Sequence, residues 1–194
     1  MSHPLGYTYD DPSLPHTPVT LADLEALKQS VLWLPDDEAA MRRAGEVLIP
    51  QTEAILDVWY GFVGAHPHLV ATFAGRDATP DMAYLGAVRK RFAQWIDDLC
   101  NRPYDAAWLG YQDEIGRRHH TAGKNRTDHA ESASKHIPLR DLIAFISPIT
   151  LTIRPFLQHG CTDPDEVETL HNAWLKSVAL TVALWARPYN PELW

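Results

Sequence analysis

The chain has 194 residues, 45% of them apolar and 22% charged, which is the composition of a folded globular protein and excludes a disordered chain. Its formal charge of −8 argues against nucleic acid and against an anionic membrane surface as partners, because both bind basic faces. The two cysteines are far apart, no signal-peptide pattern is present, and no apolar run could span a bilayer. These features favour a soluble, cytoplasmic protein.

The chain begins with a proline-rich arm, residues 1–19, where four prolines favour extended or looped backbone. We expect a single domain to follow over residues 20–194. Its first helix is predicted to begin at Thr20, which has capping-box spacing with Asp23. The apolar stripe of this helix runs to Leu32.

The remaining helices follow from proline positions and apolar spacing. Acidic residues after Pro35 predict a helix start, because acids suit the positive end of a helix. Pro50 interrupts that pattern, so we expect two helices that meet there at an angle, the second ending near Gly64. We also expect a kink at Pro148. Further helices are predicted over residues 68–74, 80–100, 104–120, 137–157 and 163–186.

The segments between these helices complete an all-α prediction. Residues 75–80 are typical of a turn, and residues 121–136 are polar without periodicity. A loop of that length inside a compact domain is typically functional or mobile. No stretch has the alternation of a strand. The last two helices are apolar over most of their circumference, so they need cover from the same domain or from a partner subunit.

Two adjacent histidines, His119 and His120, end the helix predicted over residues 104–120. Residues four apart share a helix face, so His119 continues the apolar line that contains Ile115. His120 lies about a third of a turn away. We therefore expect His119 to point inward and His120 to lie at the helix edge, where a cation suits the negative C-terminal end.

An inward histidine in an aromatic-rich helical core has two interpretations. It can cap the helix or bind a backbone carbonyl, or it can be an axial ligand of a haem iron. The chain contains no nucleotide-binding, serine-hydrolase or zinc-protease motif. Aromatic side chains that could line a flat haem slot, or could equally belong to the core, are Trp59, Tyr60, Phe62, Phe73, Phe92 and Phe145.

The whole chain resembles the protoglobins, single-domain haem proteins related to globin-coupled sensors. The resemblance rests on the order and spacing of several segments, which are "GYTYD", "AGEVL", "ILDVWYGFVGAHPHL", "YLGAVRKRFAQWI", "EIGRRHH", "FISPIT", "RPFL" and "AWLKSVALTVALWARPY".

This resemblance implies a globin fold with an additional helix before the first globin helix and with an N-terminal extension. It implies haem b, with His119 as the iron ligand, in agreement with the helix-face argument. Arg91 is a candidate partner for a haem propionate or a solvated side chain of its helix face, and Ile115 lies on the same side as His119. The resemblance places the gas-binding side on Trp59, Tyr60, Phe73, Val88, Phe92, Leu142, Phe145 and Ile149.

The function implied by the resemblance is reversible binding of O2, CO or NO by a five-coordinate haem. Tyr60 is expected to donate its hydroxyl hydrogen to bound O2, and Trp59 to shape the pocket. A homodimer through the last two long helices is implied as well.

Other functions remain open from sequence. The haem could act as a gas sensor in trans, or as an enzyme with nitric-oxide dioxygenase or peroxidase-like activity. Without haem, the chain could be a helical interaction module. Nitrate turnover with an added reductant would distinguish the enzyme, and a colourless purified protein would indicate the module.

Overall fold

The computed structural model describes residues 3–75, 79–131 and 134–193. In these residues the regular structure is helical, beside an isolated bridge between Ala74 and Pro80. The predicted all-α class is confirmed. The elements in chain order are α1 (Leu21–Ser30), α2 (Asp37–Leu48), η1 (Ile49–Gln51), α3 (Thr52–Gly64), α4 (Pro67–Val70), η2 (Ala71–Phe73), α5 (Met82–Asn101), α6 (Ala106–His119), α7 (Leu139–Leu151), α8 (Arg154–Gly160), α9 (Pro164–Ala186), η3 (Arg187–Tyr189) and η4 (Pro191–Leu193).

The first helix begins as expected but ends earlier. The Thr20 hydroxyl and the Asp23 carboxylate form the predicted capping box. At the other end, the amide of Trp33 donates to the Lys28 carbonyl, and Leu32 adopts a positive φ of 58°. This is a Schellman ending, which closes the helix before Leu32. Leu32 therefore leaves the predicted stripe and is 74% exposed.

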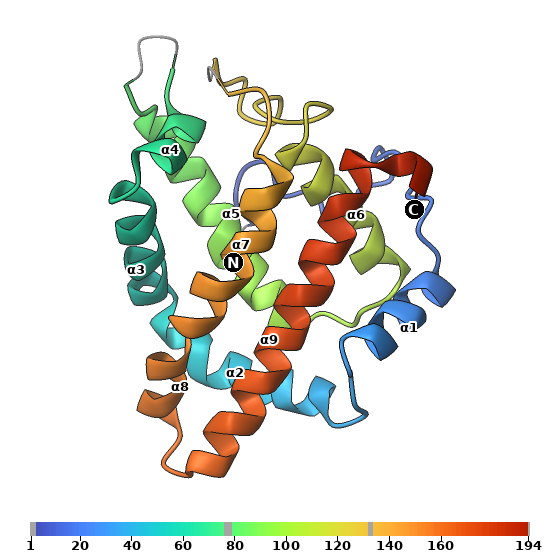
Figure 1. Cartoon of the computed structure of the whole chain (residues 1–194), viewed down its shortest axis with the longest axis vertical. Coiled ribbons are helices and arrows are strands. Elements are labelled where there is room, and N and C mark those ends of the chain that lie inside the picture. Colours follow the sequence, from blue (N-terminus) through green and yellow to red (C-terminus); the bar gives the residue numbers. More distant parts are fainter. Residues whose placement is uncertain (1–2, 76–78, 132–133, 194) are drawn as a thin grey trace.

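Two prolines control where the longer helices break. The break predicted at Pro50 is present, because η1 separates α2 from α3 and the two helices run in different directions (Figure 1). Pro148 lies inside α7, so the kink expected there stays a prediction, whereas the single helix predicted over residues 137–157 is divided into α7 and α8. The break comes after Leu151, because Pro155 has no amide hydrogen for the Leu151 carbonyl and its ring would collide with that carbonyl in a continuous helix.

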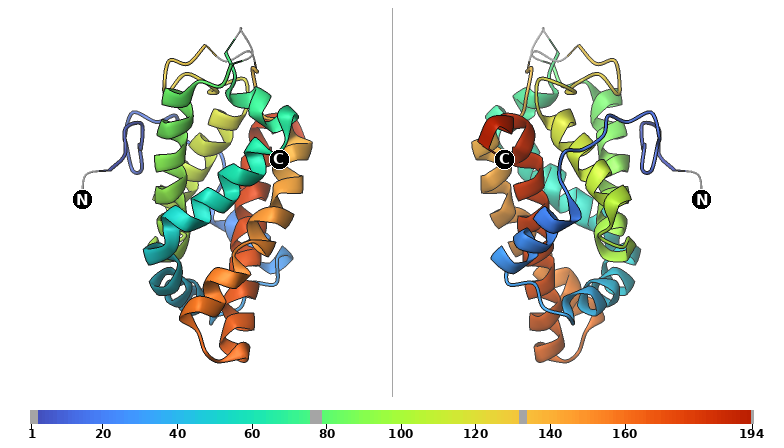
Figure 2. Two further views of the ribbon diagram at one scale, coloured as in Figure 1. Left: turned by 90° about the vertical axis from the view of Figure 1, so that its left-hand side faces the viewer. Right: turned by 90° about the vertical axis from the view of Figure 1, so that its right-hand side faces the viewer.

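The helices form two layers. Figure 2 shows α5 and α6 in one layer and α7 and α9 in the other, with α3 crossing at one edge. Helix α9 packs against α2, α6, α7 and α8, and α2 also packs against α5. Fully buried side chains that fill this core include Leu48, Leu56, Ile96, Leu99, Trp108, Leu109, Leu157, Leu170 and Trp174.

The arm contains no helix in its described residues, 3–19, and it runs along the outside of the α5–α6 layer before it enters α1 (Figure 2). The Tyr7 hydroxyl donates to both carboxylate oxygens of Asp98 on α5, at 2.9 Å. The Arg102 guanidinium lies 4.4 Å from the centre of the Tyr9 ring. These contacts attach the arm to the helical body.

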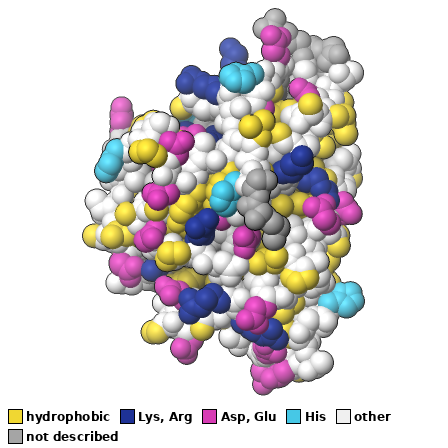
Figure 3. All heavy atoms as spheres, turned by 180° about the vertical axis from the view of Figure 1, so that it is seen from behind, with side chains coloured by type: hydrophobic (Ala, Val, Ile, Leu, Met, Phe, Trp, Pro, Cys, Tyr) yellow, Lys and Arg dark blue, Asp and Glu magenta, His cyan; other side chains and the backbone are white. Residues whose placement is uncertain are grey.

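The outer surface carries charges of both signs. Figure 3 shows acidic and basic side chains mixed over the face seen from behind. Among the described residues, no helix has both the length and the apolar character needed to cross a bilayer.

The turn expected over residues 75–80 is closed by a hydrogen bond from the Gly75 amide to the Thr79 carbonyl, and its middle residues, 76–78, lie outside the described part of the chain.

Candidate functional site

A cavity of about 210 Å³ lies between the two layers, at the end of the molecule that carries α4 and residues 121–131 (Figure 1). A cavity that holds one water molecule needs only about 10–15 Å³. The lining is mainly apolar and aromatic with a few polar groups, which is typical of a cofactor or ligand site. The cavity brings together the residues that the resemblance and the helix-face argument assign to the cofactor or the gas: Trp59, Tyr60, Phe73, Val88, Arg91, Phe92, Ile115, His119, Leu142, Phe145 and Ile149. Phe62, a further aromatic candidate from the sequence, does not line the cavity and packs against Trp59 and His66 instead.

His119 is the last residue of α6 and lies in the interior of the protein. Its side chain lines the cavity, which accounts for its intermediate exposure. Its Nδ1 is 2.8 Å from the Ile115 carbonyl oxygen. Burial lowers the pKa of His119 to about 4, so the ring is neutral at pH 7. Nδ1 must then carry the hydrogen that it donates to Ile115, and Nε2 carries the lone pair.

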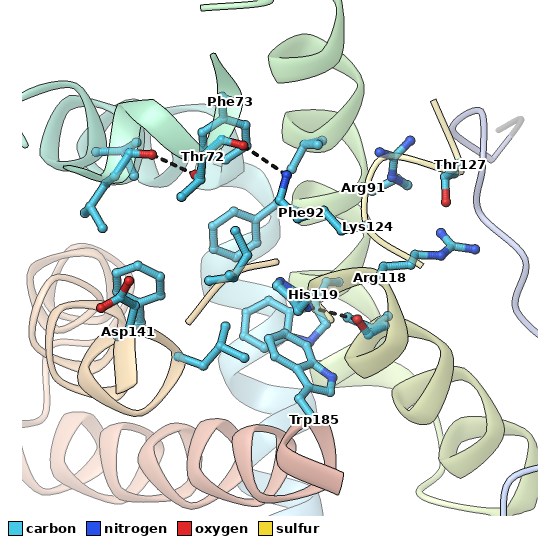
Figure 4. Close-up of a pocket in the computed structure, with 18 of the residues that line it drawn as sticks. Thr72, Phe73, Arg91, Phe92, Arg118, His119, Lys124, Thr127, Asp141 and Trp185 are labelled. Carbon is cyan, nitrogen blue, oxygen red and sulfur yellow. Dashed lines mark hydrogen bonds between the residues drawn. The ribbon is translucent and has the colours of Figure 1, made fainter. Parts of the chain in front are cut away.

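The histidine ring is held from a second side by Trp185 of α9. The two rings are stacked, with centres 4.8 Å apart and planes 23° apart (Figure 4). The Trp185 indole nitrogen donates to the Gln112 side-chain oxygen, at 3.0 Å. Gly116 makes this approach possible, because a Cβ there would lie 3.0 Å from the Trp185 Cα. The His119 imidazole therefore has a fixed orientation.

His120 has a different environment. It is the C-cap of α6 and does not line the cavity. Its ring lies 4.9 Å from the Tyr189 ring, nearly edge-on. Burial lowers the pKa of His120 as well, with a further contribution from His136. The structure thus separates the two histidines as the helix-face argument predicts.

The α3 side of the cavity is aromatic. Trp59 meets Phe92 and Phe145 edge-on, at centre distances of 5.7 and 5.2 Å. The Tyr60 side chain is mostly buried, and this burial raises the pKa of its hydroxyl well above its usual value, so the hydroxyl keeps its hydrogen. Across residues 3–75, 79–131 and 134–193, neither the Tyr60 hydroxyl nor the Trp59 indole nitrogen makes a hydrogen bond.

Arg91 closes the cavity toward the arm and is already paired. Its guanidinium forms two hydrogen bonds with the Asp128 carboxylate, at 2.9 and 2.5 Å, and a third with the Leu5 carbonyl, at 3.0 Å. Gly6 fits beside this pair with a φ of 78° and no room for a Cβ. If Arg91 also bound a haem propionate, as predicted, its guanidinium would have to be shared between the propionate and Asp128.

The sequence did not point to several further residues of the lining. Arg118 binds Glu114, the Gly6 carbonyl and the Thr8 hydroxyl. Lys124 places its amine inside the cavity, and Trp185 carries the stack described above. Each of these depends on contacts between distant segments, so local periodicity carries no signal for them. The only local sign is that Glu114 precedes Arg118 by four residues, a spacing that pairs opposite charges on a helix.

Comparison with known proteins agrees with this geometry. The family model described as Protoglobin matches residues 20–194. The chain belongs to the protoglobin family. This protoglobin is also similar in structure to the globin domain of the Geobacter sulfurreducens globin-coupled sensor, with a TM-score of 0.65 and 13% sequence identity. That match covers 86% of this chain and 97% of the sensor domain. No curated protein matches the chain at a significant level.

The resemblance seen in the sequence and the predicted globin fold, with α1 as the additional helix, are therefore confirmed. The residues of this protoglobin also fit a haem. A neutral imidazole whose Nε2 makes no hydrogen bond in the described structure could serve as the protein's ligand to a haem iron. The aromatic lining suits the flat ring, and cationic side chains line the same cavity.

Proposed function

We propose that this protein binds haem b through His119 and takes up diatomic gases, O2, CO or NO, reversibly in the remaining space of the cavity. Membership of the protoglobin family makes haem-based gas binding the general expectation. When bound, a ferrous haem supplies an open coordination position for a gas molecule. The assignment of His119 rests on one observation, the neutral imidazole whose Nδ1 donates to the Ile115 carbonyl and whose Nε2 makes no hydrogen bond within the described residues.

The α6 side would orient the cofactor. A metal-bound histidine commonly donates its second ring nitrogen to a carbonyl or carboxylate, which fixes its tautomer and its direction. The Ile115 carbonyl has this position here, and the Trp185 stack restricts rotation of the ring. The His119 Nε2 would therefore be oriented before haem binds.

The α3 side would receive the gas. Tyr60 keeps its hydroxyl hydrogen and has no partner for it in the described structure, so it can donate to a gas molecule that carries partial negative charge. Trp59, Phe92 and Phe145 surround this position with aromatic edges. Their apolar surface excludes water, which strengthens such a hydrogen bond.

The test is an absorption spectrum of the purified protein as isolated, after reduction, and after reduction under CO. We expect a haem spectrum that changes on reduction and again, reversibly, with CO. A colourless protein that folds equally well with and without added haem would overturn the proposal.

We also propose that two copies pair through the C-terminal helices. Exposed apolar side chains on these helices support this pairing, with Ile143 54% and Leu151 66% exposed on α7 and Leu175 40% exposed on α9. Sedimentation at micromolar concentration is expected to give twice the mass of the chain. A monomer at that concentration would contradict the dimer and leave the haem proposal intact.

A further inference from the structure

The side chain of Lys124 is buried in the wall of the cavity and is surrounded by neutral groups. The residue is only 7% exposed. Its amine donates to the Thr72 carbonyl at 3.0 Å, to the Tyr84 hydroxyl at 3.4 Å and to the Asn125 side-chain oxygen at 2.8 Å. Figure 4 shows the amine reaching across the cavity to Thr72.

The other two cations of the lining are neutralised. Arg91 is paired with Asp128, and Arg118 with Glu114 at 2.8 Å. Both lie on the side of the cavity that faces the arm (Figure 4). Among the residues that the structure describes, no carboxylate lies within 4.0 Å of the Lys124 amine. The lining thus contains one cation without a described counter-charge.

A buried ammonium without a counter-charge is unfavourable, because the protein interior solvates it less well than water does. Burial accordingly lowers the pKa of Lys124 to about 8. Neutral oxygens compensate in part, whereas an anion inside the cavity would compensate further. The porphyrin of haem b carries carboxylates at one edge, so a bound haem brings such anions into the cavity.

Backbone hydrogen bonding places Lys124 beside the C-terminal end of α6, close to His119. The Lys124 amide donates to the His120 carbonyl, at 2.9 Å. Gly123 lets the chain turn there, since a Cβ would lie 2.7 Å from the Arg117 carbonyl oxygen. The end of α6 therefore positions both the imidazole of His119 and the amine of Lys124.

We propose that Lys124, rather than Arg91, binds a carboxylate of the porphyrin. This inference rests on the proposed function and concerns which side chain anchors the acidic edge of the cofactor. In this arrangement the amine exchanges part of its contact with Thr72 and Tyr84 for the carboxylate, while Arg91 remains bonded to Asp128 and to the arm.

The experiment compares haem with its dimethyl ester, in which both carboxylates are blocked. The dissociation rate of each porphyrin is measured by transfer to an excess of a competing haem-binding protein. For Lys124→Met we expect the haem rate to rise about 10- to 100-fold, the effect of losing a charge-assisted hydrogen bond, and the ester rate to stay unchanged. Lys90→Met is the matched control, because it removes an exposed lysine of α5, and both rates are expected to remain at their wild-type values.

The outcomes separate this inference from the proposed function. Equal changes for haem and ester in Lys124→Met, or no change in either, would overturn the role of Lys124. So would a carboxylate-dependent change in Arg91→Met that Lys124→Met lacks. Wild-type protein that binds neither porphyrin would overturn the haem proposal itself. Circular dichroism checks the fold, and Lys124→Gln provides a second neutral variant if Lys124→Met does not fold.

Discussion

The α6 wall and the α3 wall of the cavity hold their polar atoms in different ways. On α6, the His119 ring is bonded to Ile115 and stacked on Trp185, and Arg118 is paired with Glu114. On α3, the Tyr60 hydroxyl and the Trp59 indole nitrogen make no hydrogen bond within the described residues. One wall is fixed in advance, and the other keeps its donors available.

This difference matches the two tasks that the proposal assigns. A cofactor that stays bound benefits from an imidazole whose tautomer and direction are already set, because the imidazole then loses little rotational entropy when the cofactor binds. A gas that comes and goes benefits from a donor that breaks no protein hydrogen bond when it engages. The cavity therefore combines the α6 wall, whose polar atoms are already bonded, with the α3 wall, whose donors make no hydrogen bond within the described residues.

The largest effect should come from removing the fixed ligand. We expect His119→Ala to lower haem retention by more than about a hundredfold, since loss of even an outer partner of a metal ligand costs about 10- to 100-fold. His120→Ala is the control, because His120 lies outside the cavity, and it should retain the wild-type spectrum. Loss of haem in His120→Ala alone would invert the assignment of the two histidines.

A smaller effect is expected on the α3 wall. Tyr60→Phe removes one hydrogen-bond donor and leaves the ring in place, so the O2 dissociation rate should rise by about 3- to 10-fold. The CO dissociation rate should rise less, because bound CO carries less negative charge. Stopped-flow measurement of both gases provides the internal control. Equal changes for O2 and CO would leave Tyr60 with only a steric role.

The smallest effects concern two glycines, and they need no cofactor. Gly116 lies against the α9 backbone, so Gly116→Ala should lower the free energy of unfolding by about 1 kcal/mol, as crowding outweighs the gain in helix propensity. Gly61 of α3 has no heavy atom within 4 Å of an added Cβ, so Gly61→Ala should raise it by up to about 1 kcal/mol. Urea unfolding measures both. Changes of the same sign would show that the walls do not differ in packing.

Much of the fold could be predicted because its signals are local. Thr20 and Asp23 cap α1 through bonds between near neighbours, and Pro50 separates two helices by its own geometry. The two departures also have short-range causes that apolar spacing does not contain. A Schellman ending removes Leu32 from the first helix, and Pro155 divides the helix predicted over residues 137–157 into α7 and α8.

The candidate site could be predicted only in part. Its aromatic and histidine members follow from helix faces and from the resemblance to protoglobins, and the structure places them around one cavity. That they bind haem stays a prediction. The partners of the charged members were not predictable, because Arg91 meets Asp128 and Lys124 meets Thr72 across long stretches of chain.

By itself, the sequence determined the helical class, most helix ends and the inward direction of His119, because caps, prolines and the helical repeat act within a few residues. Only the tertiary structure decided which cation of the cavity is left without a described counter-charge, which ring stacks on His119 and which donors remain unused. Those properties depend on distances between segments far apart in the chain, and packing alone sets such distances.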